Sequence, residues 1–173
     1  MKTIVVYQSS TGFTKKYAQW ISEELSCDLS AYADASKKIN DYDVIIYGGG
    51  IMAGKVAGFG KLKKNPHISG KKLVLFATGG TDRNASEVIN SIRDSNLSSQ
   101  EQQSIPFYYF ESGINYENMG FFSKTILKIM CKSLQKKTNR TPEETGMMNA
   151  LMKSSDHSDK ALIKPLITYV KAL

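Results

Sequence analysis

The chain has 173 residues, of which 41% are hydrophobic and 23% charged, a balance typical of one globular domain with a substantial core. We expect that domain to cover residues 1–173, and its formal net charge is +7. The apolar run at the N-terminus, Ile4–Tyr7, is too short for a signal peptide, and no other stretch is long enough to span a membrane. Cys27 and Cys131 have no metal-binding or redox spacing, so we expect buried thiols in a reducing cytosol and no metal site.

Short apolar runs alternate with segments of helical periodicity, which predicts an α/β fold with a doubly wound parallel sheet and helices on both faces. The predicted strands lie at residues 3–7, 27–32, 43–47, 72–77 and 105–110. Helical segments are predicted at residues 13–25, 58–65, from 84, from 98, 121–137 and 159–172, and residues 34–40 are predicted to form a turn or a short helix. The segments from 84 and 98 carry a Glu three residues later, the spacing of a capping box. The last helix should kink or begin near Lys164, because Pro165 does not fit a helix interior.

A turn rich in hydroxyl groups joins the first predicted strand to the first predicted helix. It consists of Ser9, Ser10, Thr11, Gly12, Phe13 and Thr14. A helix start presents unpaired N–H groups and the positive end of the helix dipole, so this turn suits an anion. Residues 7–14 include no Lys or Arg, and such neutral donors suit a phosphate that stays bound without reacting. Helix capping alone needs one hydroxyl rather than four.

This turn resembles the FMN-phosphate loop of flavodoxins, Ser/Thr-x-Ser/Thr-Gly-x-Thr, in residue type and in its place after the first strand. The resemblance implies FMN as the cofactor, with its phosphate bound by the turn, and a five-stranded parallel sheet of order 2-1-3-4-5. Two competing phosphate loops are missing their defining residues. There is no Gly-Lys-Ser/Thr of a Walker loop, and no Gly-x-Gly-x-x-Gly follows the strand.

Two glycine-rich stretches follow the third and fourth predicted strands. By the resemblance, both lie around the flavin ring, through Gly49, Gly50, Ile51, Met52, Ala53, Gly54, Thr78, Gly79 and Gly80. Neither stretch has the Trp or Tyr that stacks on the flavin in flavodoxins, so Tyr116 or Phe121 is the candidate for that contact. Arg83 either approaches a carboxylate or the flavin, or lies in solvent. A glycine-rich turn with no ligand also stays open for the second stretch.

The segment between Met119 and Arg140 has six basic residues and no acidic one, which indicates a basic surface. Four lysines of the helix predicted at 121–137 recur every four residues and drift by only about 40° per step. They form one stripe, Lys124, Lys128, Lys132 and Lys136. Such a helix binds an anionic membrane surface or an acidic partner, or else packs its apolar face on its own domain.

The segment from Gly113 to Lys132 is similar to the menaquinone-dependent protoporphyrinogen dehydrogenase family, in which a basic helix follows the fifth strand. This second resemblance covers that segment only, and it implies a quinone as acceptor and a place at the inner face of the membrane. Three functions stay open: an FMN-dependent electron carrier of the cytoplasm, a surface-associated flavoenzyme passing electrons to a quinone, and a non-redox module for a phosphate ligand. We expect no nucleic-acid partner, and no residue stands out as a catalytic acid, base or nucleophile.

Overall fold

A parallel sheet forms the centre of the computed structural model, which describes residues 1–115, 117–118, 120–136 and 154–173. Its strands are β1 (Thr3–Gln8), β2 (Asp28–Ala31), β3 (Val44–Met52), β5 (Lys72–Gly79) and β6 (Phe107–Glu111). They lie in the order β2-β1-β3-β5-β6, and the short β4 (Lys55–Val56) pairs antiparallel with the end of β3. With β4 left out of the numbering, this is the order 2-1-3-4-5, so the predicted sheet is confirmed.

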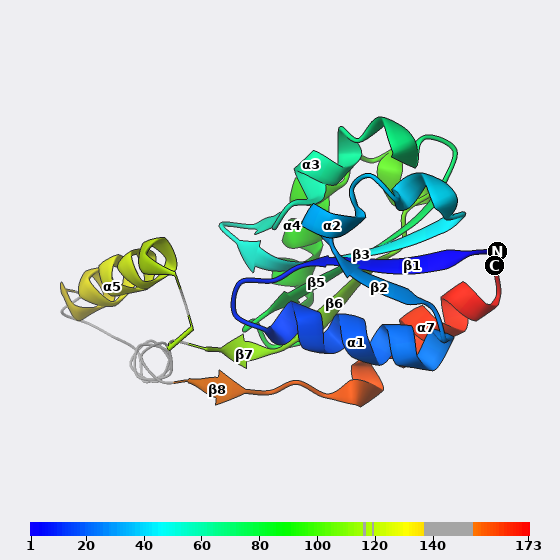
Figure 1. Ribbon diagram of the computed structural model, residues 1–173. Helices are drawn as coiled ribbons and strands as arrows, with labels where there is room; N and C mark the ends of the chain where they lie inside the picture. Colours follow the sequence, from blue (N-terminus) through cyan, green and yellow to red (C-terminus); the bar gives the residue numbers. More distant parts are fainter. Residues whose placement is uncertain (116, 119, 137–153) are drawn as a thin grey trace.

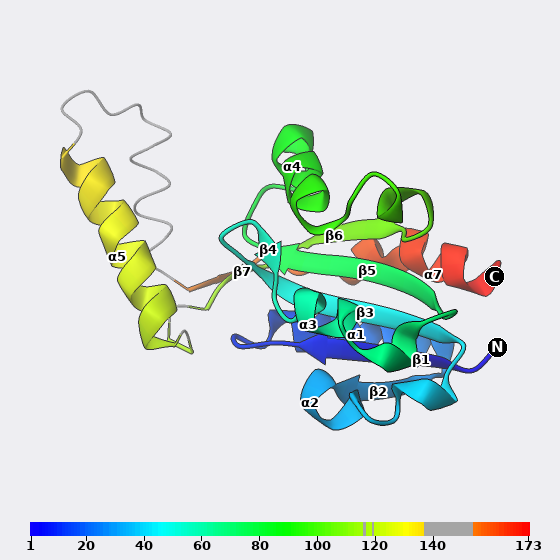
Figure 2. The ribbon, with the colours of Figure 1, turned by 90° about the horizontal axis from the view of Figure 1, so that it is seen from above.

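Helices cover both faces of this sheet (Figures 1 and 2). One face carries α1 (Phe13–Leu25) and α7 (Lys164–Lys171), and the other carries α2 (Tyr32–Ala35), α3 (Phe59–Lys63) and α4 (Ser86–Asn96). Short 3-10 helices lie at Ile39–Asp41, Pro66–Ile68, Glu101–Gln103 and Lys160–Ile163. The doubly wound arrangement predicted from the alternating pattern is therefore present.

The three inner strands, β1, β3 and β5, are buried on both faces, which is why they have nearly continuous apolar sequences. In β1, Val6 packs in the cluster that includes Leu62 of α3, whereas its neighbour Val5 packs in the cluster that includes Ile21 of α1. Successive side chains of a strand point to opposite faces, so β1 contributes to two separate cores. These two cores hold the carboxyl ends of the strands in fixed positions.

The third strand is longer than its sequence suggests. β3 continues through Gly48, Gly49 and Gly50 to Met52, so the prediction of a loop beginning at Gly48 is wrong. A Cβ atom built on Gly48 would lie 1.9 Å from the ring of Phe76 on β5. Glycine is needed at this position because the ring of Phe76, on the neighbouring strand, occupies the space that a side chain would take. β5 likewise extends two residues beyond the predicted end, to Gly79.

One predicted capping box is present and the other is absent. The Ser98 amide donates to Glu101 Oε2 at 2.7 Å, and the Glu101 amide donates to Ser98 Oγ at 3.3 Å. The start predicted at Asn84 is wrong, since α4 begins at Ser86 without a side-chain cap. The Asn84 amide donates instead to Asp82 Oδ1, a local turn that competes with the helix. At the other end of the chain, α7 begins at Lys164 as predicted.

The chain between β6 and α7 leaves the sheet and returns to it. It departs through β7 (Gly113–Ile114) and returns through β8 (Ser155–Asp156), which pair antiparallel. Between them lies α5 (Phe121–Lys136), the predicted basic helix. Both views show α5 beyond β7 and apart from the sheet and its helical layers (Figures 1 and 2). The side chains of Ile126, Leu127, Met130 and Leu134, which belong to its apolar face, lie outside the described residues, so packing of that face on its own domain stays a prediction. None of the helices in the described part of the chain is long and apolar enough to cross a membrane.

Candidate functional site

The three stretches singled out from the sequence meet at the carboxyl ends of β1, β3 and β5. Thr14, in the first turn of α1, lies 2.8 Å from Thr78 at the end of β5, measured between the two Oγ1 atoms. Gly50 of β3 pairs with Thr78 in the sheet, and a Cβ atom built on Gly50 would lie 3.6 Å from Thr14 Oγ1. The three stretches therefore lie together, and they form one candidate site.

The first loop, residues 9–14, is closed by its own side chains and by that of Asn115, which follows β7. The Gly12 amide donates to Ser9 Oγ at 3.1 Å, and Asn115 Nδ2 donates to the Thr11 carbonyl oxygen at 3.2 Å. Gly12 caps α1 with a φ of 96°, a value that favours glycine. A Cβ atom at Gly12 would meet nothing within 4 Å, so the backbone is open on that side.

Several donors of this loop and of the first turn of α1 have no acceptor within the described residues. They are the amides of Thr11, Phe13, Thr14 and Lys15 and the hydroxyl groups of Ser10 and Thr11. The amides belong to the start of α1, where the helix dipole adds positive potential. This donor set matches the chemistry of a bound phosphate group.

Thr14 and Thr78 are both buried, with 2% and 3% of their surfaces exposed. Their hydrogen bond uses one of the two hydroxyl hydrogens, so the other remains available to a ligand. Thr14 therefore links the first loop to the third in addition to any contact with a ligand. Sequence analysis assigned it only to the phosphate.

The second stretch is a β-hairpin rather than a loose loop. β3 and β4 are joined by a two-residue turn, in which Ala53 has a φ of 49° and Gly54 a φ of 76°. Positive φ at both central positions is typical of a type I′ turn. Such a backbone costs a residue with a Cβ atom about 1–2 kcal/mol, so Ala53 is held by its surroundings. Met52 at the tip is 51% exposed.

The two glycines before this hairpin have different roles. A Cβ atom at Gly49 would lie 2.6 Å from both the Ala57 carbonyl oxygen and Val56 Cγ1, so the fold itself requires glycine there. At Gly50 the nearest atom is Thr14 Oγ1, at an ordinary contact distance of 3.6 Å. Only Gly50 is thus available to admit a ligand without being needed for packing.

Asn96, the last residue of α4, fixes the hairpin, and sequence analysis missed it. Its Oδ1 accepts from the Val56 amide at 2.8 Å, and its Nδ2 donates to the Gly54 carbonyl oxygen at 2.9 Å. Nothing in the local sequence marks this residue, because its partners are about 40 positions away.

The third stretch is fixed by Tyr109 of β6, which sequence analysis also missed. Its hydroxyl donates to the Thr81 carbonyl oxygen at 2.8 Å, and a Cβ atom at Gly79 would lie 3.2 Å from that hydroxyl. Burial raises the pKa of Tyr109 to about 12, so the hydroxyl stays protonated as a donor. Gly80 lies beside β7, with Gly113 as its nearest neighbour.

Arg83 approaches two carboxylates rather than lying free in solvent. Its Nε lies 3.4 Å from Glu111 Oε2, and its Nη1 lies 3.5 Å from Asp159 Oδ2. Asp159 also donates its amide to Tyr17 Oη at 3.0 Å. These contacts connect the third stretch to β6 and to the segment before α7.

The proposed stacking residues are not tested, since Tyr116 and the side chain of Phe121 lie outside the described residues.

A groove of about 360 Å³ adjoins the first loop. It is lined by Phe13, Ile114, Asn115, Glu117, Asn118, Ser154, Ser155 and Asp156. In this groove Asp156 accepts from Lys16 Nζ at 2.8 Å. Although burial opposes ionisation of Asp156, hydrogen bonds from Lys16 and Ser158 lower its pKa to about 2.

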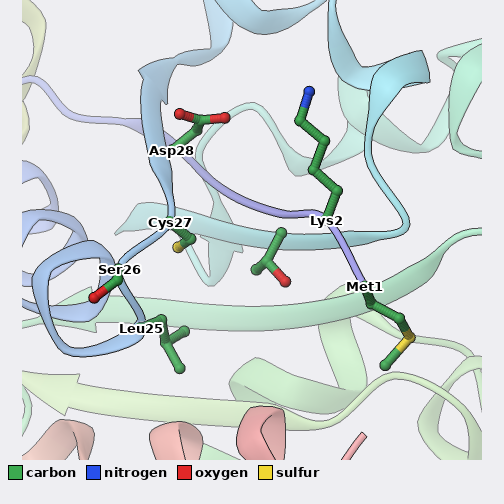
Figure 3. Close-up of a pocket in the computed structure, with 7 residues that line it drawn as sticks. Met1, Lys2, Leu25, Ser26, Cys27 and Asp28 are labelled. Atoms are coloured by element: carbon green, nitrogen blue, oxygen red, sulfur yellow. The ribbon is translucent and has the colours of Figure 1, made fainter.

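A second hollow, of about 250 Å³, lies at the opposite edge of the sheet, beside the amino ends of β1 and β2 (Figure 3). Its polar groups serve the fold: Asp28 Oδ2 accepts from Tyr42 Oη at 2.8 Å, and Lys2 Nζ lies 4.5 Å from the Tyr42 ring centroid.

Cys27 lines this hollow and is only half-buried, which corrects the expectation of full burial, whereas Cys131 is buried. Burial and the neighbouring Asp28 carboxylate raise the pKa of the Cys27 thiol to about 11, which makes it unreactive at neutral pH. Among the described residues, no group of three metal-binding side chains comes together.

Residues 4–141 match the sequence model of a flavodoxin domain family. The chain belongs to this family. No curated protein matches it.

Solved structures similar to the chain include oxidised flavodoxin 2 from Bacillus cereus, at 20% identity and a TM-score of 0.45, with 63% of this chain and 84% of the other covered. A flavoprotein in complex with FMN from Lactobacillus acidophilus is 16% identical, with a TM-score of 0.41 and coverage of 64% and 91%. The Trp repressor binding protein from Bacillus subtilis is 14% identical, with a TM-score of 0.46 and coverage of 80% and 100%.

Membership of a flavodoxin family implies a flavin cofactor, and the residues present fit one. The unpaired donors at the start of α1 suit a phosphate group, and Gly12 leaves room for close approach. The open face of Gly50 adds space beside Thr14. The chemistry of these groups, and the lack of any Lys or Arg in residues 7–14, agree with a phosphate that is held rather than transferred.

Proposed function

We propose that this protein binds FMN and acts as a flavodoxin-like electron-transfer protein. The observation that carries the proposal is the set of amides and hydroxyl groups of residues 10–15 that have no acceptor within the described part of the chain, at the edge where the other two stretches meet. A bound flavin supplies the redox chemistry, and the protein holds the flavin and shields it from water.

The residues of the site have separate tasks in this proposal. The loop of Ser9, Ser10, Thr11, Gly12, Phe13 and Thr14 holds the phosphate. The hairpin residues Ile51 to Gly54, with Gly49 and Gly50 before them, lie along one side of the flavin ring. Thr78, Gly79 and Gly80 lie along another side, where Tyr109 and Arg83 keep the chain in place.

The test compares two flavins and two variants. FMN should bind more tightly than riboflavin, which has no phosphate group. Thr11→Ala should weaken FMN binding by about 10- to 100-fold, because it removes a hydroxyl donor to a charged group worth about 1.5–3 kcal/mol. Ser69→Ala, at an exposed serine outside the site, is the control and should change nothing. Titrations followed by flavin fluorescence measure all four constants.

Equal affinities of the wild-type protein for FMN and riboflavin would contradict the phosphate loop. A protein purified without a flavin spectrum, and with no affinity for FMN, would favour the remaining alternative of a non-redox module that binds another phosphate ligand. The two results are distinct, because the first still leaves a flavoprotein.

We further propose that α5 is the surface that meets an anionic partner, namely lipid headgroups at a membrane surface. α5 lies apart from the folded layers (Figure 2). Its residues Lys128, Lys132 and Lys136 are exposed. Ile129 beside them is 62% exposed, which gives this basic surface an apolar contact as well. A quinone, which partitions into membranes, is the acceptor that such a location suits. The electron donor is left open.

A further inference from the structure

One side chain of α4 connects both sides of the hairpin turn to the rest of the molecule. Asn96 receives the Val56 amide on Oδ1, and it donates from Nδ2 to the carbonyl oxygens of Gly54 and Ile92. The last of these bonds, at 2.7 Å, fixes the amide group to its own helix. Asn96 is buried, so these bonds are shielded from water. A carboxylate in its place would provide no donor for the two carbonyl oxygens.

The hairpin needs such a connection. It has only two residue pairs, Ile51 with Val56 and Met52 with Lys55, and a hairpin of that size is marginal by itself. Its turn also places Ala53 at a φ of 49°, which persists only where neighbouring contacts enforce it. A second contact reaches the same helix end, since the Lys55 ammonium group donates to the Ser95 carbonyl oxygen.

The hairpin lies beside the candidate site. Ile51 Cδ1 is 3.4 Å from the position that a Cβ atom on Gly79 would take, so the hairpin adjoins the third stretch. The Ala57 amide donates to the Gly50 carbonyl oxygen at 2.9 Å. The chain that follows β4 therefore lies against Gly50. A shift of the hairpin therefore changes the wall of the site.

We propose that Asn96 is a positioning residue for the flavin: it keeps the β3–β4 hairpin ordered in the shape that contacts the ring. This inference rests on the proposed function. A hairpin that is already ordered loses no conformational freedom when the flavin binds, and this raises the affinity. Because the hairpin faces the ring and not the phosphate, Asn96 should affect FMN and riboflavin equally.

The experiment compares Asn96→Ala and Asn96→Asp with the wild-type protein and with Asn65→Ala. Asn65 is the matched control, since its side chain also bonds two backbone groups, those of Ser36 and His67, but away from the candidate site. Dissociation constants for FMN and riboflavin are measured well below the unfolding temperature. Under that condition a loss of global stability alone does not change the affinity of the folded protein. Amide hydrogen exchange at Val56, with buried Val74 as internal reference, reports on the hairpin directly.

We expect both Asn96 variants to bind FMN and riboflavin about tenfold more weakly, with faster exchange at Val56 and unchanged exchange at Val74. Asn65→Ala should leave both affinities unchanged. Thr11→Ala should weaken FMN alone, which separates the hairpin from the phosphate loop. Unchanged affinities in both Asn96 variants overturn the inference, as does a loss confined to FMN. A wild-type protein that binds neither flavin overturns the proposed function, and with it the role of Asn96, even where exchange at Val56 shows that the hairpin has loosened.

Discussion

Gly49 and Gly50 are adjacent in the sequence and look equivalent there, but their surroundings in the structure are opposite. We expect Gly49→Ala to lower the free energy of unfolding by about 1–3 kcal/mol, because its Cβ atom would overlap Ala57 and Val56. Gly50→Ala has room and should leave that free energy within about 0.5 kcal/mol of the wild-type value. Chemical denaturation of the apoprotein measures both changes.

The same pair of variants also tests the site. The methyl group of Gly50→Ala would project toward Thr14 Oγ1, into the space between the first and second stretches. We expect FMN to bind about tenfold more weakly to this stable variant, a loss of about 1.4 kcal/mol. FMN binding equal to that of the wild-type protein would show that this face of Gly50 does not contact the cofactor.

The residues that sequence could identify were those with local signals. The loop of residues 9–14 has its hydroxyl groups and its glycine within six positions, so its motif is recognisable from the sequence alone. Asn96 and Tyr109 act on backbone groups of other segments, and no pattern in their own neighbourhood predicts this. The glycines of β3 give no such local signal, since a glycine needed for close packing in a strand is indistinguishable in sequence from one in a loop.

At the scale of elements, α5 offers the sharpest test. If its lysines meet anionic lipid, the protein should sediment with anionic vesicles at low salt. This binding should weaken as the Debye length falls from about 30 Å at 0.01 M to about 8 Å at 0.15 M ionic strength. The triple variant Lys128→Gln, Lys132→Gln, Lys136→Gln should abolish sedimentation.

A matched triple variant controls for the change in net charge. Lys61→Gln, Lys64→Gln, Lys72→Gln removes the same charge from exposed lysines on the sheet domain, and it should sediment as the wild-type protein does. Equal losses in the two triple variants would indicate a nonspecific effect of net charge. Binding to neutral vesicles as strong as to anionic ones would contradict the electrostatic account.

Long periodic segments made the elements predictable, and tertiary contacts decided their ends. The alternation of apolar runs with helical periodicity predicted all five parallel strands, although β3 and β5 run further than expected. The β3–β4 hairpin was not foreseen, because its turn uses Ala53 where Asn or Asp is the usual signal. α4 begins at Ser86, two residues after the predicted start at Asn84, because the Asn84 amide donates to Asp82 Oδ1.

For the whole molecule, binding of FMN at the junction of three strand ends should stabilise the entire fold. A ligand that binds only the native state at 100 times its dissociation constant adds about 2.7 kcal/mol, which for a chain of this size raises the melting temperature by roughly 5–11 °C. Riboflavin at the same concentration should raise it less, because the donors at the start of α1 gain no phosphate. Inorganic phosphate at millimolar concentration should raise it least, since it reaches neither the hairpin nor the third stretch. Thermal unfolding followed by circular dichroism distinguishes these ligands.

An increase in melting temperature with phosphate equal to that with FMN would favour a phosphate-binding module over a flavoprotein. An increase with riboflavin equal to that with FMN would show that the binding energy comes from contacts with the flavin ring, and it would contradict the role of the phosphate loop.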